Sequence, residues 1–200
     1  MYYRLKDDYI LRGWDKLPYA VVNTKTGLAV FITSKQMQAL ELCDGNIDLS
    51  MPFIPDVMKK LISKYESSGI IEQCKKGQGL TLHQQYKKYP SRYISSAHWA
   101  ITGKCNYKCR HCYMSAPEIN AYQAPHENIM KIIDQLSECG VMSVSLTGGE
   151  PLLRDDFLEI ADSLTEHGII IAHIYSNGSL VNEKILGELD KRKYDHSQRQ

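Results

Sequence analysis

The chain has 200 residues, of which 43% are hydrophobic and 24% are charged, and its formal net charge is +1. This composition is typical of a globular protein of one or two domains. The near-zero charge gives no reason to expect a nucleic acid or an anionic membrane as partner. The N-terminal stretch MYYRLKDDYILRGW lacks the apolar segment of a secretory signal, and no apolar run reaches the roughly 20 residues that span a bilayer. We therefore expect a cytoplasmic protein with reduced thiols.

Residues 1–73 predict a small α+β domain. The stretch AVVNTKTGLAVFIT indicates two short strands around a turn. Ser34 is expected to cap a helix that stops at Gly45, and Pro55 is expected to open a second helix that ends at Gly69. With a closing strand, this order is winged-helix-like. The alternative is a plain packing domain without a binding role.

Residues 74–92 are polar and lack hydrophobic periodicity, so the sequence predicts a linker there. From residue 93 to 190, the pattern alternates between strand and helix. The runs ISSAHWAIT, VMSVSL and IIIAHIY predict strands, and HENIMKIIDQLSECG, DDFLEIADSLTEHG and NEKILGELDK predict helices. This βαβαβα order implies an α/β fold with three parallel strands and right-handed crossovers. Residues 191–200 are polar and are expected to form a disordered tail.

Three of the six cysteines, Cys105, Cys109 and Cys112, occur within TGKCNYKCRHCYMSA. In a reducing compartment such clustering indicates metal or redox chemistry rather than disulfides. Three thiolates can hold three irons of a 4Fe–4S cluster and leave the fourth iron open for a ligand. Zinc is the alternative, with His111 or His98 as a fourth ligand.

The remaining cysteines are scattered. Cys43 and Cys139 fall near the ends of apolar-periodic helices and are expected to be small core residues, whereas Cys74 is assigned no role. His98 and Trp99 alternate along the first strand and are expected to pack on its opposite faces.

Two further loops follow directly on predicted strands. The segment TGGEPLLR supplies two glycines, a carboxylate and a proline: Gly148, Gly149, Glu150 and Pro151. The glycines let a ligand approach the backbone, and the carboxylate or the neighbouring carbonyls can accept hydrogen bonds from a cationic amine. The segment YSNGS supplies Ser176 and Asn177, which either line the same site or form a turn with Gly178 at positive φ. Because the carboxyl ends of parallel strands share one edge, we expect one site.

CNYKCRHC and GGEP resemble the CxxxCxxC and amine-binding motifs of the radical S-adenosylmethionine (SAM) superfamily, and the resemblance covers residues 93–190. His111 stands where that family usually has an aromatic residue. TGKCNYKCRHCYMSA and LTGGEPLLRDDF are most similar to members with an extra C-terminal cluster domain, which include peptide-modifying maturases and haem-pathway enzymes. Residues 1–73 are similar in pattern to the peptide-recognition winged helix fused to such maturases.

The resemblance implies a function for each of these segments. Cys105, Cys109 and Cys112 would ligate a 4Fe–4S cluster whose open iron chelates the amino and carboxylate groups of SAM. Residues 148–151 would receive the SAM amino group, with Ser176 and Asn177 lining the site. One electron would cleave a C–S bond, giving methionine and a 5′-deoxyadenosyl radical that abstracts hydrogen from the substrate. The resemblance further implies a flavodoxin- or ferredoxin-like electron donor and a peptide substrate, with no catalytic residue beyond the cluster.

The family barrel normally has six βα units, whereas this sequence predicts three. We therefore expect a partial (βα) barrel, as in an N-terminal piece of a longer enzyme. Two other readings stay open, namely a non-catalytic peptide-binding module with a relic cluster or zinc loop, and a radical SAM enzyme of haem biosynthesis.

Overall fold

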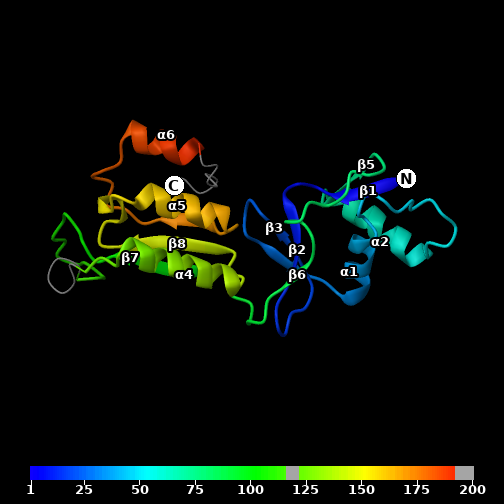
Figure 1. The fold of residues 1–200 in the computed structure, drawn as a ribbon, viewed down its shortest axis with the longest axis horizontal. Coiled ribbons are helices and arrows are strands. Elements are labelled where there is room, and N and C mark those ends of the chain that lie inside the picture. Colours follow the sequence, from blue (N-terminus) through cyan, green and yellow to red (C-terminus); the bar gives the residue numbers. More distant parts are fainter. Residues whose placement is uncertain (116–121, 192–200) are drawn as a thin grey trace. The chain divides into compact units, whose positions relative to one another are not determined.

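The computed structural model describes residues 1–115 and 122–191, and it divides the chain into two compact units, Met1–Tyr93 and Ile94–Gln200 (Figure 1). The predicted tail at 191–200 lies outside the described residues except for Lys191. Each unit has a hydrophobic core of its own. None of the helices in these described ranges is long and apolar enough to cross a membrane.

The N-terminal unit contains six strands and two helices among its described residues. The strands are β1 (Tyr2–Leu5), β2 (Tyr9–Gly13), β3 (Ala20–Asn23), β4 (Ala29–Phe31), β5 (Ile71–Cys74) and β6 (Lys87–Lys88). They form one sheet in the order β4-β3-β2-β6 and a β1-β5 pair. The helices are α1 (Ser34–Glu41) and α2 (Asp56–Ser67). The predicted strand pair, two helices and closing strand are all present.

The first helix begins differently from the prediction. Thr33, not Ser34, is its N-cap, and the Thr33 hydroxyl accepts a hydrogen bond from the backbone N–H of Gln36. The Gln36 side chain accepts from the backbone N–H of Thr33 in return, which completes a capping box. The helix ends at Glu41, before the predicted stop at Gly45. Cys43 is fully buried as expected, and burial raises the pKa of its thiol to about 12.

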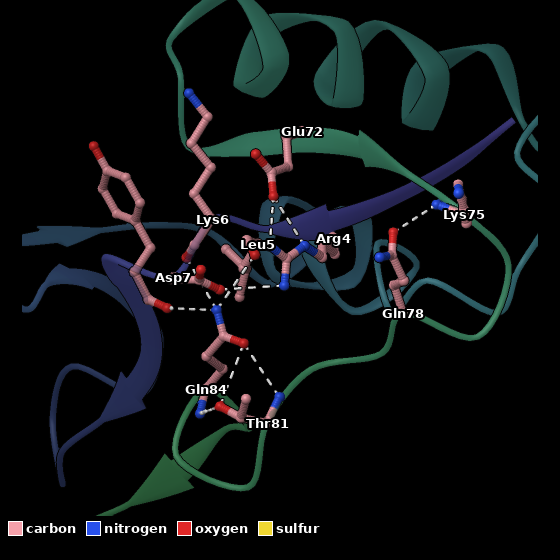
Figure 2. A network of polar contacts seen from close by, with 10 residues as sticks. Arg4, Leu5, Lys6, Asp7, Glu72, Lys75, Gln78, Thr81 and Gln84 are labelled. Carbon is pink, nitrogen blue, oxygen red and sulfur yellow. Dashed lines mark hydrogen bonds and ion pairs between the residues drawn. The ribbon is translucent and has the colours of Figure 1, made fainter.

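Residues 74–92, expected as a linker, instead pack into the N-terminal unit. Gln84 is 2% exposed, and its side-chain amide donates to the backbone carbonyls of Leu5, Lys6 and Tyr9 (Figure 2). Its carbonyl oxygen accepts from the N–H and hydroxyl of Thr81. Polar residues that suggested a linker therefore form a buried hydrogen-bond network. Such a segment shows no hydrophobic periodicity in the sequence.

The second unit has the predicted parallel sheet. Its strands are β7 (Ala97–Thr102), β8 (Ser143–Gly148) and β9 (Ile170–Ile174), in the order β7-β8-β9. Both pairings are parallel. The intervening helices are α4 (His126–Glu138) and α5 (Phe157–Glu166), and α6 (Glu183–Lys191) follows β9. This confirms a mixed α/β architecture with three βα units.

One face of this sheet packs on helices α4 and α5 (Figure 1). Ile133 of α4 and Ile160 of α5 are fully buried in one core with Val144 and Leu146 of β8. This burial follows from the apolar stripes of both helices.

The opposite face carries polar residues in one row, because the register pairs His98 with Ser145 and Ser145 with His173. Trp99 lies on the helix-covered face, so the predicted alternation of His98 and Trp99 is confirmed. The prediction for Cys139 is wrong: it caps the C-terminus of α4 and is exposed. A residue at the helix end leaves the buried stripe, which spacing alone did not show.

Candidate functional site

Three loops at the carboxyl edge of the parallel sheet contain the predicted site residues. The first loop follows β7 and carries the cysteines, the second follows β8 with the Gly-Gly-Glu-Pro segment, and the third follows β9 with the Ser-Asn-Gly segment. Hydrogen bonds join all three loops, so the structure brings together residues such as Asn106 and Asn177, which are 71 positions apart in the chain.

The two glycines allow the second loop to lie against the first. Gly148 has φ +132°, and a side chain there would overlap the carbonyl oxygen of Thr102. A side chain at Gly149 would overlap the carbonyl oxygen of Lys104 and reach 3.0 Å from Cβ of Cys105. Backbone hydrogen bonds of 2.9 Å from Gly149 N to Thr102 O and 2.8 Å from Glu150 N to Lys104 O hold this contact. The glycines thus position the start of the cysteine loop.

Glu150 is fully buried and connects the second loop to the third. Its Oε1 accepts from Leu152 N at 3.0 Å and from the Ser176 hydroxyl at 2.9 Å, and its Oε2 accepts from Asn177 N at 2.7 Å. Within the described ranges, no lysine, arginine or histidine forms an ion pair with this carboxylate. Pro151 is also buried and begins a 3₁₀ turn (Pro151–Leu153) that Glu150 caps.

The third loop reaches the cysteine loop through Asn177. Its Nδ2 lies 3.9 Å from Cys105 Sγ and 2.9 Å from Asn106 Oδ1. Asn106 Nδ2 donates at 2.8 Å to the hydroxyl of Ser179. Gly178 has φ +78°, as expected for a turn, and the Ser176 hydroxyl accepts from its N–H. The segment therefore forms the expected turn, and this turn contacts the cysteine loop.

The three cysteines lie on one short loop as free thiols. Cys105 and Cys112 are partly buried and Cys109 is exposed. A backbone hydrogen bond of 3.1 Å from Cys112 N to Cys109 O gives the loop a tight turn between these two residues. Across residues 1–115 and 122–191, no three His, Cys, Asp or Glu side chains are already gathered as ligands of one metal ion. His111, the zinc alternative, is exposed on this loop.

Arg154 is a structural residue of the site that the sequence did not reveal as such. The Arg154 side chain is 1% exposed and donates to the carbonyls of Ile101 and Ala124. It also forms a two-bond ion pair with Asp156, at 2.8 and 2.7 Å. The hydrogen bond from Arg154 lowers the pKa of the Asp156 carboxyl. The hydrogen bond from Arg154 to the Ile101 carbonyl holds the end of β7, where the cysteine loop begins.

A protein-family model for the radical SAM superfamily matches residues 99–197. This segment belongs to the radical SAM superfamily. Its cysteine and Gly-Gly-Glu-Pro loops both fall inside the match. Because the superfamily consists of enzymes, and curated relatives are named as a cyclase and a maturase, the radical SAM segment is an enzyme domain.

The radical SAM segment is similar to two kinds of curated protein. A "Probable GTP 3',8-cyclase" of Methanothermobacter thermautotrophicus is 33% identical over 90 residues, which is 45% of this chain and 30% of that protein. The "Mycofactocin maturase MftC" of Mycobacterium ulcerans is 32% identical over 91 residues, which is 46% of this chain and 24% of that protein. The chain thus spans a third or less of the length of these relatives.

Among solved structures, SuiB of Streptococcus suis has the same fold over most of the chain. The match has a TM-score of 0.56 at 20% identity and covers 96% of this chain and 45% of that one. SuiB has also been crystallised with S-adenosylmethionine and with the precursor peptide SuiA. The likeness extends beyond the radical SAM segment into the N-terminal unit.

Proposed function

We propose that this protein, alone or as part of a longer enzyme, binds a 4Fe–4S cluster and SAM at the three-loop edge and modifies a peptide. Cys105, Cys109 and Cys112 would hold the cluster, because three thiolates can bind three of the four irons and leave one iron for SAM. When bound, the two groups supply the reductive cleavage of SAM to methionine and a 5′-deoxyadenosyl radical. The protein's own residues would bind and position these two groups.

The observation that best supports a bound SAM is the buried charge of Glu150. A buried carboxylate is costly unless a cation and hydrogen bonds accompany it. Glu150 has the hydrogen bonds but, in the part of the chain that the structure describes, no cationic side chain as partner. An ammonium group held at the neighbouring backbone of Gly148 and Gly149 would supply the missing positive charge. Since Glu150 is fully buried, its carboxylate would attract the amine electrostatically and hold the loops together. The backbone carbonyls of Gly148 and Gly149 would make the direct contact with the amine.

The glycines and the third loop have supporting parts in this proposal. Gly148 and Gly149 let the second loop pack directly on the backbone of Thr102 and Lys104, which places it beside the cysteine loop. The Ser176 hydroxyl donates to Glu150, whereas Asn177 donates to Glu150 through its backbone N–H and to Asn106 of the cysteine loop through its side chain. We infer that Ser176 and Asn177 support the site by holding the Glu150 loop and the cysteine loop in place.

A peptide substrate is supported by the similarity to SuiB and to the mycofactocin maturase. We propose that the N-terminal unit, in the manner of a winged-helix module, recognises this peptide. It contains a mainly apolar pocket of about 290 Å³ between β1 and α2, lined by Tyr3, Leu49, Ile62 and Ser63 among others. A flavodoxin- or ferredoxin-like protein in the cytosol would supply the electron.

The experiment for the cofactor part is anaerobic reconstitution with iron and sulfide, followed by SAM binding and an assay for 5′-deoxyadenosine. We expect Glu150→Gln to weaken SAM binding about tenfold, which is about 1.4 kcal/mol. The matched control is Glu166→Gln, on the exposed end of α5. Equal SAM affinity in both variants would refute the role given to Glu150.

The peptide part is tested separately by selection from a displayed library of short random peptides. Ser63→Trp would fill the pocket and should abolish enrichment, whereas Ser68→Trp, at the exposed C-cap of the same helix, should not. Enrichment that survives Ser63→Trp would show that this pocket is not the binding site.

A further inference from the structure

We propose that the side-chain amide of Asn177 is a hydrogen-bond donor to the Cys105 sulfur that raises the reduction potential of the cluster. The inference rests on the cluster proposed above. It gives Asn177 a role as a positioning residue, acting through Cys105 rather than on SAM.

The first support is that the orientation of the Asn177 amide is fixed by its partners. Its Oδ1 accepts from the backbone N–H of Ser179 at 2.9 Å and from the Ser179 hydroxyl at 2.7 Å. An amide with its oxygen held in this way must direct its nitrogen to the other side. There Nδ2 meets Asn106 Oδ1 at 2.9 Å and Cys105 Sγ at 3.9 Å. The network therefore selects the N–H end of the amide for the sulfur.

The second support is that Asn177 cannot easily move away. Its backbone N–H donates at 2.7 Å to the buried carboxylate of Glu150. Asn106 closes the ring of contacts by donating to the Ser179 hydroxyl at 2.8 Å. The donor is thus held at its backbone, at its oxygen and at its nitrogen, so little ordering is needed when the sulfur becomes a thiolate ligand.

The third support is that this donor serves one cysteine of the three. Cys105 Sγ also accepts from the backbone N–H of Tyr107 at 3.4 Å. At the described positions of the loop, no N–H donor is found at the sulfurs of Cys109 and Cys112. Among the described residues, Cys105 therefore has more N–H donors at its sulfur than Cys109 or Cys112.

Hydrogen bonds to cluster sulfurs are one of the factors that set reduction potential. Reduction adds negative charge to the cluster and its thiolates, and an N–H donor stabilises the more negative state. Removing the Asn177 donor should therefore make the cluster harder to reduce. Since reduction of the cluster precedes SAM cleavage in the proposed function, the donor would bring the potential within reach of the electron donor.

The test compares the reconstituted protein with Asn177→Leu, Asn177→Asp and the control Asn182→Leu, by redox titration followed with electron paramagnetic resonance. Asn182 makes local contacts at the start of α6, to Leu180 and Ile185. We expect Asn177→Leu to shift the reduction equilibrium about tenfold, or about 59 mV for a one-electron couple, toward the oxidised state. Asn177→Asp should shift it further, because a carboxylate would face the thiolate, and Asn182→Leu should leave it unchanged.

Two results would overturn the inference alone. One is an unchanged potential in both Asn177 variants with full iron content. The other is loss of iron in both while Asn182→Leu loads normally, since Asn177 would then serve assembly and not potential. Failure of the unsubstituted protein to hold any cluster would overturn the proposed function together with this inference.

Discussion

The carboxylate of Glu150 accepts a 2.9 Å hydrogen bond from the hydroxyl of Ser176, 26 residues later in the chain. This contact joins the ends of β8 and β9 behind the candidate site. Together with the contacts of Asn177 it makes the three loops one structure rather than three independent turns.

Replacing Ser176 by alanine should therefore disturb the loops without removing a cofactor ligand. A buried carboxylate would lose one donor, which costs about 1–3 kcal/mol in the free energy of unfolding. Chemical denaturation of Ser176→Ala and of Ser137→Ala, a partly exposed position on α4, checks this. Equal stability of the two variants would show that the Glu150–Ser176 bond contributes nothing.

Iron content should depend on three cysteines and not on the others. We expect Cys109→Ala, like the variants at Cys105 and Cys112, to lose the reconstituted cluster, because each supplies one thiolate ligand. Cys139→Ala, at an exposed helix end, should retain all its iron. Cys43→Ala should retain it too, with a small loss of stability from its buried position. Iron analysis of the five variants decides the assignment, and full loading of Cys109→Ala would disprove it.

The ion pair between Arg154 and Asp156 should make the second unit sensitive to acid. Arg154 lowers the pKa of Asp156 below its ordinary value of about 3.9. The stabilisation is therefore fully present above that ordinary value and is lost as the pH falls through the lower, folded-state pKa.

The measurement is thermal unfolding between about pH 2 and pH 6. Asp156→Asn should be less stable at pH 6 and should show a flatter decline toward acid than the unsubstituted protein. Asp155→Asn, at the exposed neighbouring position, should follow the unsubstituted protein. Parallel pH curves for all three would mean that Asp156 contributes no pH-dependent stability.

Residues 74–92 should behave as a folded part of the N-terminal unit. Gln84→Ala removes three donated hydrogen bonds, to Leu5 of β1, to Lys6 and to Tyr9 of β2, so amide hydrogen exchange should speed up in residues 74–92 and at residues 5–9. Gln85→Ala is a matched control, since that side chain is exposed. Fast exchange of 74–92 already in the unsubstituted protein would support the linker that the sequence suggested.

Much of the second unit could be predicted from the sequence because its signals are local. The apolar stripes of α4 and α5 and the loop motifs are each visible within about 15 residues. Gly140 and Gly168, which follow the C-caps of α4 and α5, adopt φ of +69° and +71°. What the sequence did not show depends on distant partners. Arg154 could not be recognised as a buried anchor, because its carbonyl acceptors at Ile101 and Ala124 lie 53 and 30 residues away.

In the N-terminal unit, too, local features could be predicted and features that depend on distant partners could not. Its strands and helices follow local periodicity, whereas the fold of 74–92 depends on Gln84, whose acceptors lie 75 to 79 residues earlier. A polar stretch that satisfies buried backbone groups has no hydrophobic pattern, so its composition is the same as that of a linker.

In the proposed function, the three loops hold a cluster with one iron open to SAM. The most direct measurement is the electron paramagnetic resonance spectrum of the anaerobically reconstituted, reduced protein with and without SAM. We expect about four irons per chain and a spectrum that changes when SAM is added, with a weaker change in a Gly149 variant whose side chain would overlap Lys104 O. A colourless protein that holds one zinc ion, or a cluster spectrum that is identical with and without SAM, would contradict it.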